Sequence, residues 1–471
     1  MNNVTYISPE MQALNHKTKI IDDLLGGTYS MRKAGREHLF QMPLEDEKAY
    51  KNRLNRSTLY PALSETLSQM CGRVFFDPIN TVDVDEKIQQ EFLPDVDLLG
   101  NNLDVFASQW FYAALAYGVS FVLVDYSHIQ QAITLADEKA LGARPYLIHI
   151  KPQAVLGIKY ERINGQTRLT QFRYKEFIIL DDGEFATKQV EQINVYEIGR
   201  VRKFRQGVDG GEHLLIEDIA MKINGKPLDF VPVIPFVTKN TGHHYFAEPP
   251  LMELAYLNIK HWQSQSDQDN ILNTARVPLL ARTGVSDDSA VKIGGSIIDL
   301  PKDGNLFYVE HSGASIQAGQ ESLKELESQM RVAGAKLLDK TVLAMTDSQA
   351  KDEQSKEISL LRLYANRFED ALDLTLEYVG KWLGIENVGK VEISGNIDSD
   401  YDPNASMDTV IKLNAAGIVS KQTAFNESKR RGLISDNVEW EDEQARLDGD
   451  GIDDGFSSNE NSTNSEEDEN A

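Results

Sequence analysis

Three long helical patterns between residues 248 and 389 limit what this chain can fold into more than any other feature. The first follows Pro249 and Pro250, which suit a helix start, and ends before Pro278, which disfavours a helical residue ahead of it. We therefore predict helices over 248–277, 315–340 and 357–389. At about 1.5 Å per residue the second helix is roughly 39 Å long, more than most compact domains need to span.

The second helix has a single apolar seam on an otherwise polar surface. The seam residues recur in alternate steps of three and four: Leu323, Leu326, Met330, Ala333 and Leu337. Rods with one narrow seam commonly pack against copies of themselves, so we predict that Leu323, Leu326, Met330 and Leu337 lie at an interface between subunits. The core of an ordinary helical bundle is the alternative, and periodicity alone does not separate the two.

The two connectors between these helices differ in character. Residues 278–314 hold short apolar runs separated by the turn sequences SDD, GG and PKDG, which indicate a small β module. Residues 341–356 lose all periodicity, which is typical of a flexible polar loop. In and beside that loop, Lys340, Lys351 and Lys356 are interleaved with acidic residues.

The sequence before these helices indicates an α+β chain. A helical pattern over 103–117 passes through Gly118 into an apolar run that predicts a buried strand. Residues 143–237 alternate apolar and polar side chains between NG, DDG and DGG turns, which predicts an antiparallel sheet of several strands. On an earlier helical pattern we expect Tyr50, Arg53 and Arg56 to be solvated.

The order of helix, small β module, long helix, polar loop and long helix resembles the stem, clip, stem, tunnel loop and following helix of tailed-bacteriophage portal proteins, the head–tail connectors. The likeness lies in LAYLNIKHWQSQSDQDNIL and QESLKELESQMRVAGAKLL, which resemble the stem helices of a branch long catalogued as uncharacterised phage proteins. It implies a portal-like α+β fold with these parts: wing 1–247, first stem helix 248–277, clip 278–314, second stem helix 315–340, tunnel loop 341–356, linking helix 357–389, crown-like helices 390–437 and a disordered acidic tail 438–471.

The same resemblance implies a function and a set of partners. Portal subunits form a ring of twelve at one capsid vertex, assembled in the host cytoplasm and retained in the virion, through which double-stranded DNA is packaged and ejected. The expected partners are terminase, major capsid and scaffolding proteins, and head–tail adaptor proteins. In this sequence, Lys340, Lys351 and Lys356 would then face the DNA channel.

The net charge of the chain is compatible with a DNA channel, but it does not distinguish a channel protein from one that does not bind nucleic acid. The chain has 48 Lys and Arg against 73 Asp and Glu, a formal charge of −25. The last 33 residues are acidic and nearly free of apolar side chains, so we predict that they are disordered. The rest is still acidic, which argues against tight duplex binding because Lys and Arg supply most non-specific affinity for DNA. Weak adhesion suits a conduit through which DNA slides.

Catalytic signatures are missing from the sequence. It contains no GxxxxGK[ST] loop, nucleophile elbow or HExxH helix, so we expect no catalysis, no cofactor and no bound metal. Two alternatives stay open: a metal-dependent nuclease or hydrolase whose acidic residues meet only in the fold, and a structural adaptor that forms no ring. The single Cys71 is expected to be a packing residue. The apolar run at 111–124 is too short to span a membrane, so we expect no membrane association.

Overall fold

The computed structural model describes residues 3–127, 142–163, 165–207, 211–223, 225–239, 245–276, 279–283, 305–309, 314–338, 340–341, 358–395, 397, 410–430, 434 and 438–449. Contacts between residues divide the chain into two units, Met1–Ile397 and Asp398–Ala471. The first unit combines helices with antiparallel sheets, which confirms the predicted α+β class.

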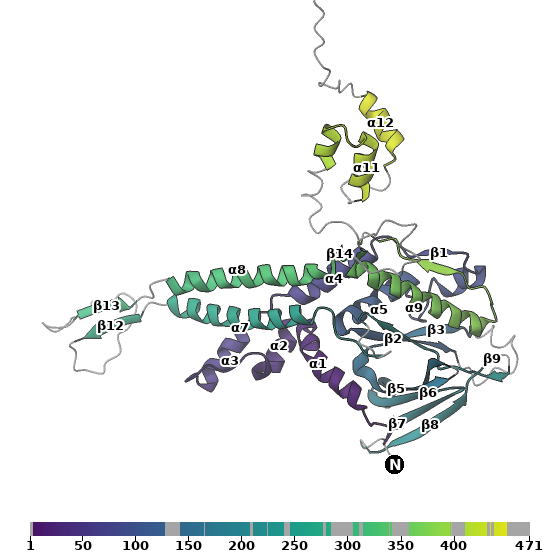
Figure 1. Cartoon of the computed structure of the whole chain (residues 1–471). Coiled ribbons are helices and arrows are strands. Elements are labelled where there is room, and N and C mark those ends of the chain that lie inside the picture. The colour runs from purple at the N-terminus through teal and green to yellow at the C-terminus, as the bar shows by residue number, and fades with distance from the viewer. Residues whose placement is uncertain are drawn as a thin grey trace, which may run out of the picture. The chain divides into compact units, whose positions relative to one another are not determined.

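The helices of the first unit include one in each of the four ranges predicted to be helical, although those predicted over 315–340 and 357–389 end five and six residues before the predicted ends, at Ala335 and Leu383 (Figure 1). They are α1 (Pro9–Leu25), α2 (Gly27–Ala34), α3 (Glu47–Arg56), α4 (Ala62–Val74), α5 (Leu103–Tyr117), α7 (Met252–Ala275), α8 (Ala314–Ala335) and α9 (Leu360–Leu383). Four shorter turns of helix accompany them: η1 (Gly35–Glu37), η2 (Ile88–Phe92), η3 (Pro152–Ala154) and η4 (Lys336–Leu338).

Two antiparallel sheets form the body of this unit. The larger contains five strands in sequence order: β4 (Val155–Ile163), β5 (Gln166–Asp181), β6 (Thr187–Glu197), β7 (Arg200–Gln206) and β8 (His213–Ala220). The smaller has β2 (Val119–Tyr126) between β11 (Val233–Val237) and β3 (Pro145–Ile150). Two-stranded pairs complete the body: β9 (Lys222–Ile223) with β10 (Lys226–Pro227), and β1 (Asn80–Val82) with β16 (Lys390–Glu392).

Strand β2 separates two hydrophobic cores. Its alternate residues Val122 and Val124 join the core built by the helices, whereas Phe121 and Leu123 join the core shared with the five-stranded sheet. The chain enters β2 from α5 through Gly118, whose φ of 83° suits glycine and whose Cβ position lies 2.8 Å from the backbone of Glu248. A side chain there would be strained and would collide with the segment leading to α7.

Helices α7 and α8 leave the body together as a rod (Figure 1). They run antiparallel, since Gln268 of α7 bonds Ile316 near the start of α8 while His261 of α7 lies against Glu327 further along α8. The far end of the rod is a two-stranded hairpin, β12 (Leu279–Thr283) with β13 (Asn305–Val309), which confirms strands in the predicted β module. The apolar run at 296–300 lies outside the described residues.

Helix α9 runs along the body and buries one of its faces there. Phe368 is fully buried there and meets Trp110, Phe111 and Phe236 with ring centroids 4.8–5.2 Å apart. Strand β16 follows α9 and pairs with β1 of the body. Residues up to Ile397 therefore belong to the first unit, and not to the separate crown-like part predicted from residue 390 onwards.

The second unit contains helical residues at 410–415, then α11 (Lys421–Arg430) and α12 (Trp440–Gly449). The prediction that the tail is disordered from residue 438 is wrong for α12. Trp440 packs on Phe425 of α11 at 5.3 Å between ring centroids, which supplies an apolar contact to an otherwise acidic segment. The acidic first turn of α12 also suits the positive end of the helix dipole. Residues 450–471 lie outside the described residues.

Candidate assembly rod and channel loop

The apolar seam of α8 faces its own chain. Leu323, Leu326 and Met330, with Leu337 in the η4 turn that follows α8, are only 2–7% exposed, and Met330 and Leu337 belong to the helical core of the body. Helix α8 packs along α7 and, near its end, on α4, where Gly334 approaches Thr66 closely. This burial is what the bundle-core alternative expects. It leaves the opposite face of α8 as the surface that a neighbouring subunit could contact.

The opposite face of α8 is polar and uncovered. Its exposed residues include Gln317, Gln320, Glu321, Lys324, Glu325, Ser328, Gln329, Arg331 and Val332. Val332 is the large apolar side chain of this face and is 60% exposed. We call these nine residues the outer face of α8. Charged and amide groups in such a row suit a contact between rods that is made largely by hydrogen bonds and ion pairs.

A belt of buried polar residues holds α7 to the body. The carboxamide of Asn258 accepts a hydrogen bond from the backbone N–H of Leu63 and donates one to the carbonyl of Tyr60, at 3.1 and 2.9 Å. Ser266 shares a 2.8 Å hydrogen bond with Ser57. These polar residues interrupt the helical stripe in the sequence, yet they are buried because each hydrogen-bonds another part of the chain.

Arg53 of α3 is the charged centre of this belt. It donates two hydrogen bonds of 2.8 Å to the buried carboxylate of Glu45, one to the carbonyl of Phe40, and longer ones to Ser266 and Asp267 of α7. The expectation that Arg53 is solvated is wrong, because the side chain is 3% exposed. Tyr50 is buried as well, whereas Arg56 is exposed as expected. No sequence pattern revealed this, since Ser266 and Asp267 lie more than 200 residues away.

The predicted channel loop begins and ends at one point of the body. Lys340 and Thr341 form β14, which pairs antiparallel with β15 (Ile358–Ser359) directly before α9. The residues between, including Lys351 and Lys356, lie outside the described residues. Lys340 therefore stands at the base of a closed loop. Its role in a channel, like that of the other two lysines, stays a prediction.

A carboxylate and imidazole cluster lies at the end of α1, where Gln263 of α7 donates a hydrogen bond of 2.9 Å to the carbonyl of His38. Asp23, Glu37 and His38 bring their ligand atoms within 4.8 Å of one another. The ammonium of Lys19 hydrogen-bonds both carboxylates, and His38 Nε2 lies 2.8 Å from Asp23 Oδ2. A positive charge is thus already supplied by the chain where a cation would sit. Within the described residues we therefore assign the cluster to packing α1 against the turn after α2.

Two groups that resemble catalytic nucleophiles are sealed inside the body. Ser120 lies 2.8 Å from His149 Nε2 but has no exposed surface, and the ring of Phe106 lies edge-on to the imidazole. Cys71 is buried, as expected, and burial raises the pKa of its thiol so that it stays protonated. Among the described helices, none combines the length and apolar content required to cross a membrane.

Part of the chain, including the rod, matches a sequence-family model. Residues 250–383, which contain α7, the β12–β13 hairpin, α8 and α9, match a family described as a domain of unknown function (DUF4055). The match covers less than half of the chain. No curated protein matches the chain in sequence.

Solved structures similar to this chain include chains from gene transfer agent (GTA) particles. A chain in the neck of an empty GTA particle is 12% identical, with 79% of this chain and 90% of that chain covered at a TM-score of 0.38. A chain in the virion of a native GTA particle is 10% identical, with 85% and 97% covered at 0.38. One in the neck of a native GTA particle is 10% identical, with 86% and 99% covered at 0.35. At this level of similarity, neither a shared role nor the function of any residue carries over from those chains to this one.

Proposed function

We propose that this chain is a portal subunit, a structural protein that forms a ring at one vertex of a phage capsid. By the resemblance in its sequence, twelve copies surround a channel for double-stranded DNA, and the ring docks terminase, capsid, scaffolding and head–tail adaptor proteins. The chain carries out no chemistry in this role. It contributes the shape of the channel and the surfaces on which its partners assemble.

The observation that carries the proposal is the rod of α7 and α8. The two helices contain 24 and 22 residues, about 36 and 33 Å, and they leave the body side by side to end in the β12–β13 hairpin. The inner seam of α8 is buried against its own chain, while the outer face of α8 remains polar and free. Repeated around an axis, such rods form a tube whose wall consists of helices and whose end carries a circle of hairpins.

The loop between β14 and β15 supports the same arrangement. Because β14 and β15 pair, the intervening residues leave and re-enter the body at one place, between the end of the rod and the start of α9. In a ring, each subunit would contribute one such loop at the same height. We propose that these loops, with Lys340, Lys351 and Lys356, narrow the channel and guide DNA.

Gel filtration with negative-stain microscopy of the full-length chain tests the proposal. We expect a species of about twelve chain masses and ring-shaped particles with a central hole. A monomer that hydrolyses nucleic acid and loses that activity with chelator would overturn the proposal in favour of the metal-dependent enzyme. A monomer without such activity would favour the adaptor.

A further inference from the structure

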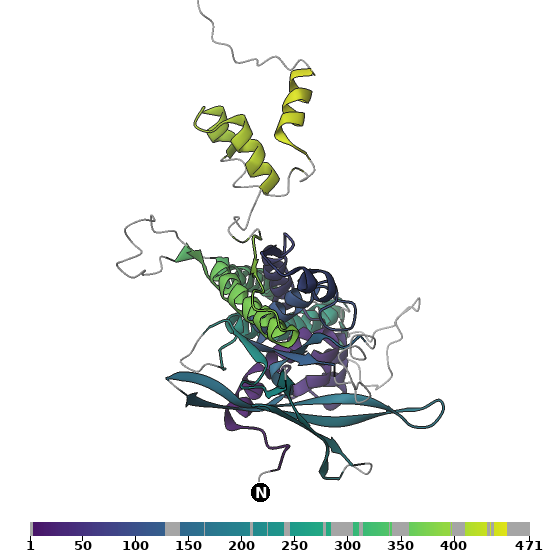
Figure 2. The same cartoon turned by 90° about the vertical axis from the view of Figure 1, so that its right-hand side faces the viewer.

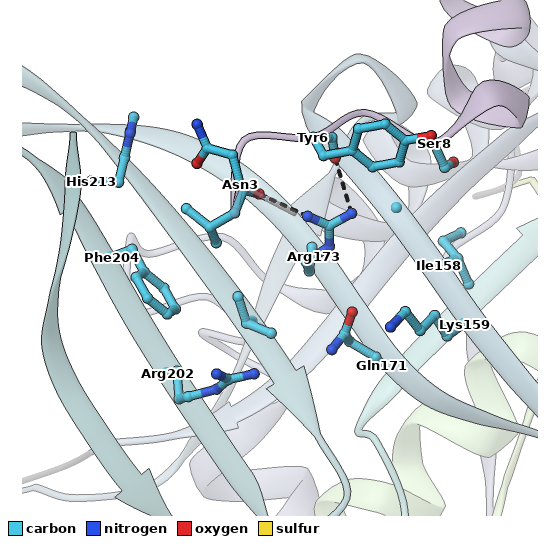
Figure 3. A pocket seen from close by; sticks show the side chains of 13 residues that line it. Asn3, Tyr6, Ser8, Ile158, Lys159, Gln171, Arg173, Arg202, Phe204 and His213 are labelled. Carbon is cyan, nitrogen blue, oxygen red and sulfur yellow. Dashed lines mark hydrogen bonds between the residues drawn. The ribbon is translucent and has the colours of Figure 1, made fainter. Parts of the chain in front are cut away.

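A basic pocket opens on the five-stranded sheet beneath the N-terminal segment at residues 3–8 (Figure 3). It encloses about 460 Å³, and its main side chains are Tyr6, Lys159, Arg173, Arg202, Phe204 and His213. The guanidinium of Arg173 fastens the N-terminal segment over the sheet by donating to the carbonyls of Val4 and Tyr6, at 2.7 and 2.9 Å. The backbone N–H of Ser8 donates a hydrogen bond of 2.8 Å to the carbonyl of Leu156, which holds the C-terminal end of this segment against the sheet.

The pocket is positive in a chain that is strongly negative. Among the described residues that line it, none carries a carboxyl group, whereas Lys159, Arg173 and Arg202 are cations. Arg202 pairs with Glu197 beside the pocket, at 2.9 Å. Arg173 has only carbonyl oxygens as hydrogen-bond acceptors, and its burial lowers its pKa, so its charge is poorly compensated. A negatively charged group entering here would meet Lys159 and Arg173, neither of which makes an ion pair within the described residues.

One buried donor beside the pocket lacks an acceptor. The Nε of Arg202 is buried and makes no hydrogen bond, although the Nη2 of the same guanidinium pairs with Glu197. The side chain of His213 is 7% exposed, and its Nε2 already lies 3.2 Å from a carboxylate oxygen of Glu191. Buried polar atoms are rarely left unpaired in folded proteins. The unpaired Nε of Arg202 is therefore suited to a ligand that accepts hydrogen bonds.

The turn between β5 and β6 carries negative charge, opposite to that of the basic pocket. It carries Asp181, Asp182 and Glu184, followed by Phe185, which is 93% exposed. Phe177 and Ile179 on the same hairpin are exposed too. Strands of the five-stranded sheet extend well past the helices of the body (Figure 2). An acidic turn with uncovered aromatic groups at the end of a long hairpin is a contact surface without a partner in its own chain.

The turn cannot reach the pocket of the same chain. Asp181 and Arg173 lie on one strand, eight residues apart, so an extended backbone keeps them about 27 Å from each other. The turn of one copy can therefore enter only the pocket of another. Two different surfaces on each subunit then make a head-to-tail contact, which closes into a ring when the rotation fits.

We propose that the acidic turn at residues 181–185 of each subunit inserts into the basic pocket of its neighbour. The carboxylates meet Lys159, Arg173 and Arg202, and the ring of Phe185 packs beside Tyr6 and Phe204. This inference rests on the proposed ring and names one of the contacts that hold it together. Charge-assisted hydrogen bonds in a partly desolvated pocket are stronger than exposed ion pairs, so the contact would also set which surfaces of two subunits meet.

Disulfide trapping tests the contact directly. The chain with both Lys159→Cys and Glu184→Cys should give a ladder of linked chains on a non-reducing gel after mild oxidation. Cys71 is buried and should not interfere. The matched control combines Glu184→Cys with Gln89→Cys, an exposed position that does not line the pocket. A ladder no stronger than that of the control would overturn the inference.

A charge exchange adds an energetic readout. We expect Glu184→Lys to raise the concentration needed for half-assembly about tenfold at low salt, and the double variant Lys159→Glu with Glu184→Lys to restore it. Equal assembly of the single and double variants would overturn the inference. If the wild type forms rings but the cysteine pair links no more strongly than the control, only this contact is overturned. If the cysteine pair links subunits but the chain forms open oligomers and no rings, the proposed ring is overturned and the contact stands. A chain that shows neither rings nor trapping would overturn both.

Discussion

At the scale of single residues, Arg53 ties three parts of the chain together. It bonds Glu45 and the Phe40 carbonyl on one side and reaches Ser266 and Asp267 of the rod on the other. The hydrogen bonds from Arg53 hold the pKa of Glu45 below its ordinary value. The resulting stabilisation is present above the pKa of the unfolded carboxyl group and is lost as pH falls through the folded value. The buried ion pair of Arg53 with Glu45 is thus one of the contacts that stabilise the base of the rod.

We predict that Arg53→Ala lowers the free energy of unfolding by about 3–5 kcal/mol, because it leaves the carboxylate of Glu45 buried without a partner. Urea titration followed by circular dichroism measures this. Arg56→Ala is the matched control, since Arg56 is exposed on the same helix and its loss should cost no more than about 0.5 kcal/mol. Equal losses in the two variants would contradict the role given to Arg53.

The pKa of His149 makes the free energy of unfolding depend on pH. Burial, with a smaller contribution from Lys151, lowers its pKa to about 4. Below the unfolded value near 6.5, the unfolded chain therefore takes up a proton that the folded chain does not, and stability falls until pH reaches about 4. We predict that His149→Gln removes up to about 3 kcal/mol of this loss. The check is urea unfolding of both proteins at pH 7 and pH 4.5; an unchanged difference between the two pH values speaks against it.

At the scale of elements, the two faces of α8 should respond differently to mutation. Leu326 is buried against the chain, so Leu326→Ala should lower the free energy of unfolding by about 2–5 kcal/mol. Val332 is exposed, and Val332→Ser should change stability by less than about 0.5 kcal/mol while weakening assembly. Unfolding curves together with gel filtration of both variants separate the effects. If Val332→Ser assembles as the wild type does, this part of the outer face of α8 is not an interface.

The helices and strands were predictable because their signals are local. Prolines and glycines mark the ends of α7, α5 and α4, and alternation marks the strands of the larger sheet. What the seam of α8 packs against was not predictable, since a buried seam has the same spacing whether its partner is the same chain or another. The buried belt around Arg53 and the pocket around Arg173 join residues that are far apart in the sequence. Helix α12 was missed because its stability depends on one aromatic contact, Trp440 with Phe425.

At the scale of the whole molecule, the acidic end of the chain should not be needed for assembly. A segment this poor in apolar residues offsets little of the entropy of its own ordering. We predict that truncation after Asn437 leaves the oligomer in the same size class, although it removes α12 and exposes Phe425 to solvent. Gel filtration of the truncated chain measures this. A shift to monomers would show that the acidic end contributes to the ring.

The channel loop carries the last prediction. DNA has one negative charge per roughly 1.7 Å of its axis, so a loop that guides it needs lysines for brief contacts and carboxylates that prevent sticking. In this sequence Lys351 and Lys356 alternate with Asp347, Asp352 and Glu353 between the paired strands β14 and β15. We predict that Lys351→Glu with Lys356→Glu leaves rings intact but lowers the DNA packaged or retained per particle.

The matched control for the loop variant is Lys48→Glu with Lys51→Glu, an equal change of charge on the exposed surface of α3. DNA per particle, measured by the ratio of absorbance at 260 and 280 nm in purified particles, should fall for the loop variant and stay normal for the control. An equal fall in both would trace the effect to net charge rather than position. Normal DNA content in the loop variant would show that the loop does not line the channel. Two lysines reversed to glutamates beside a polyanion must reduce the amount of DNA that is packaged or retained.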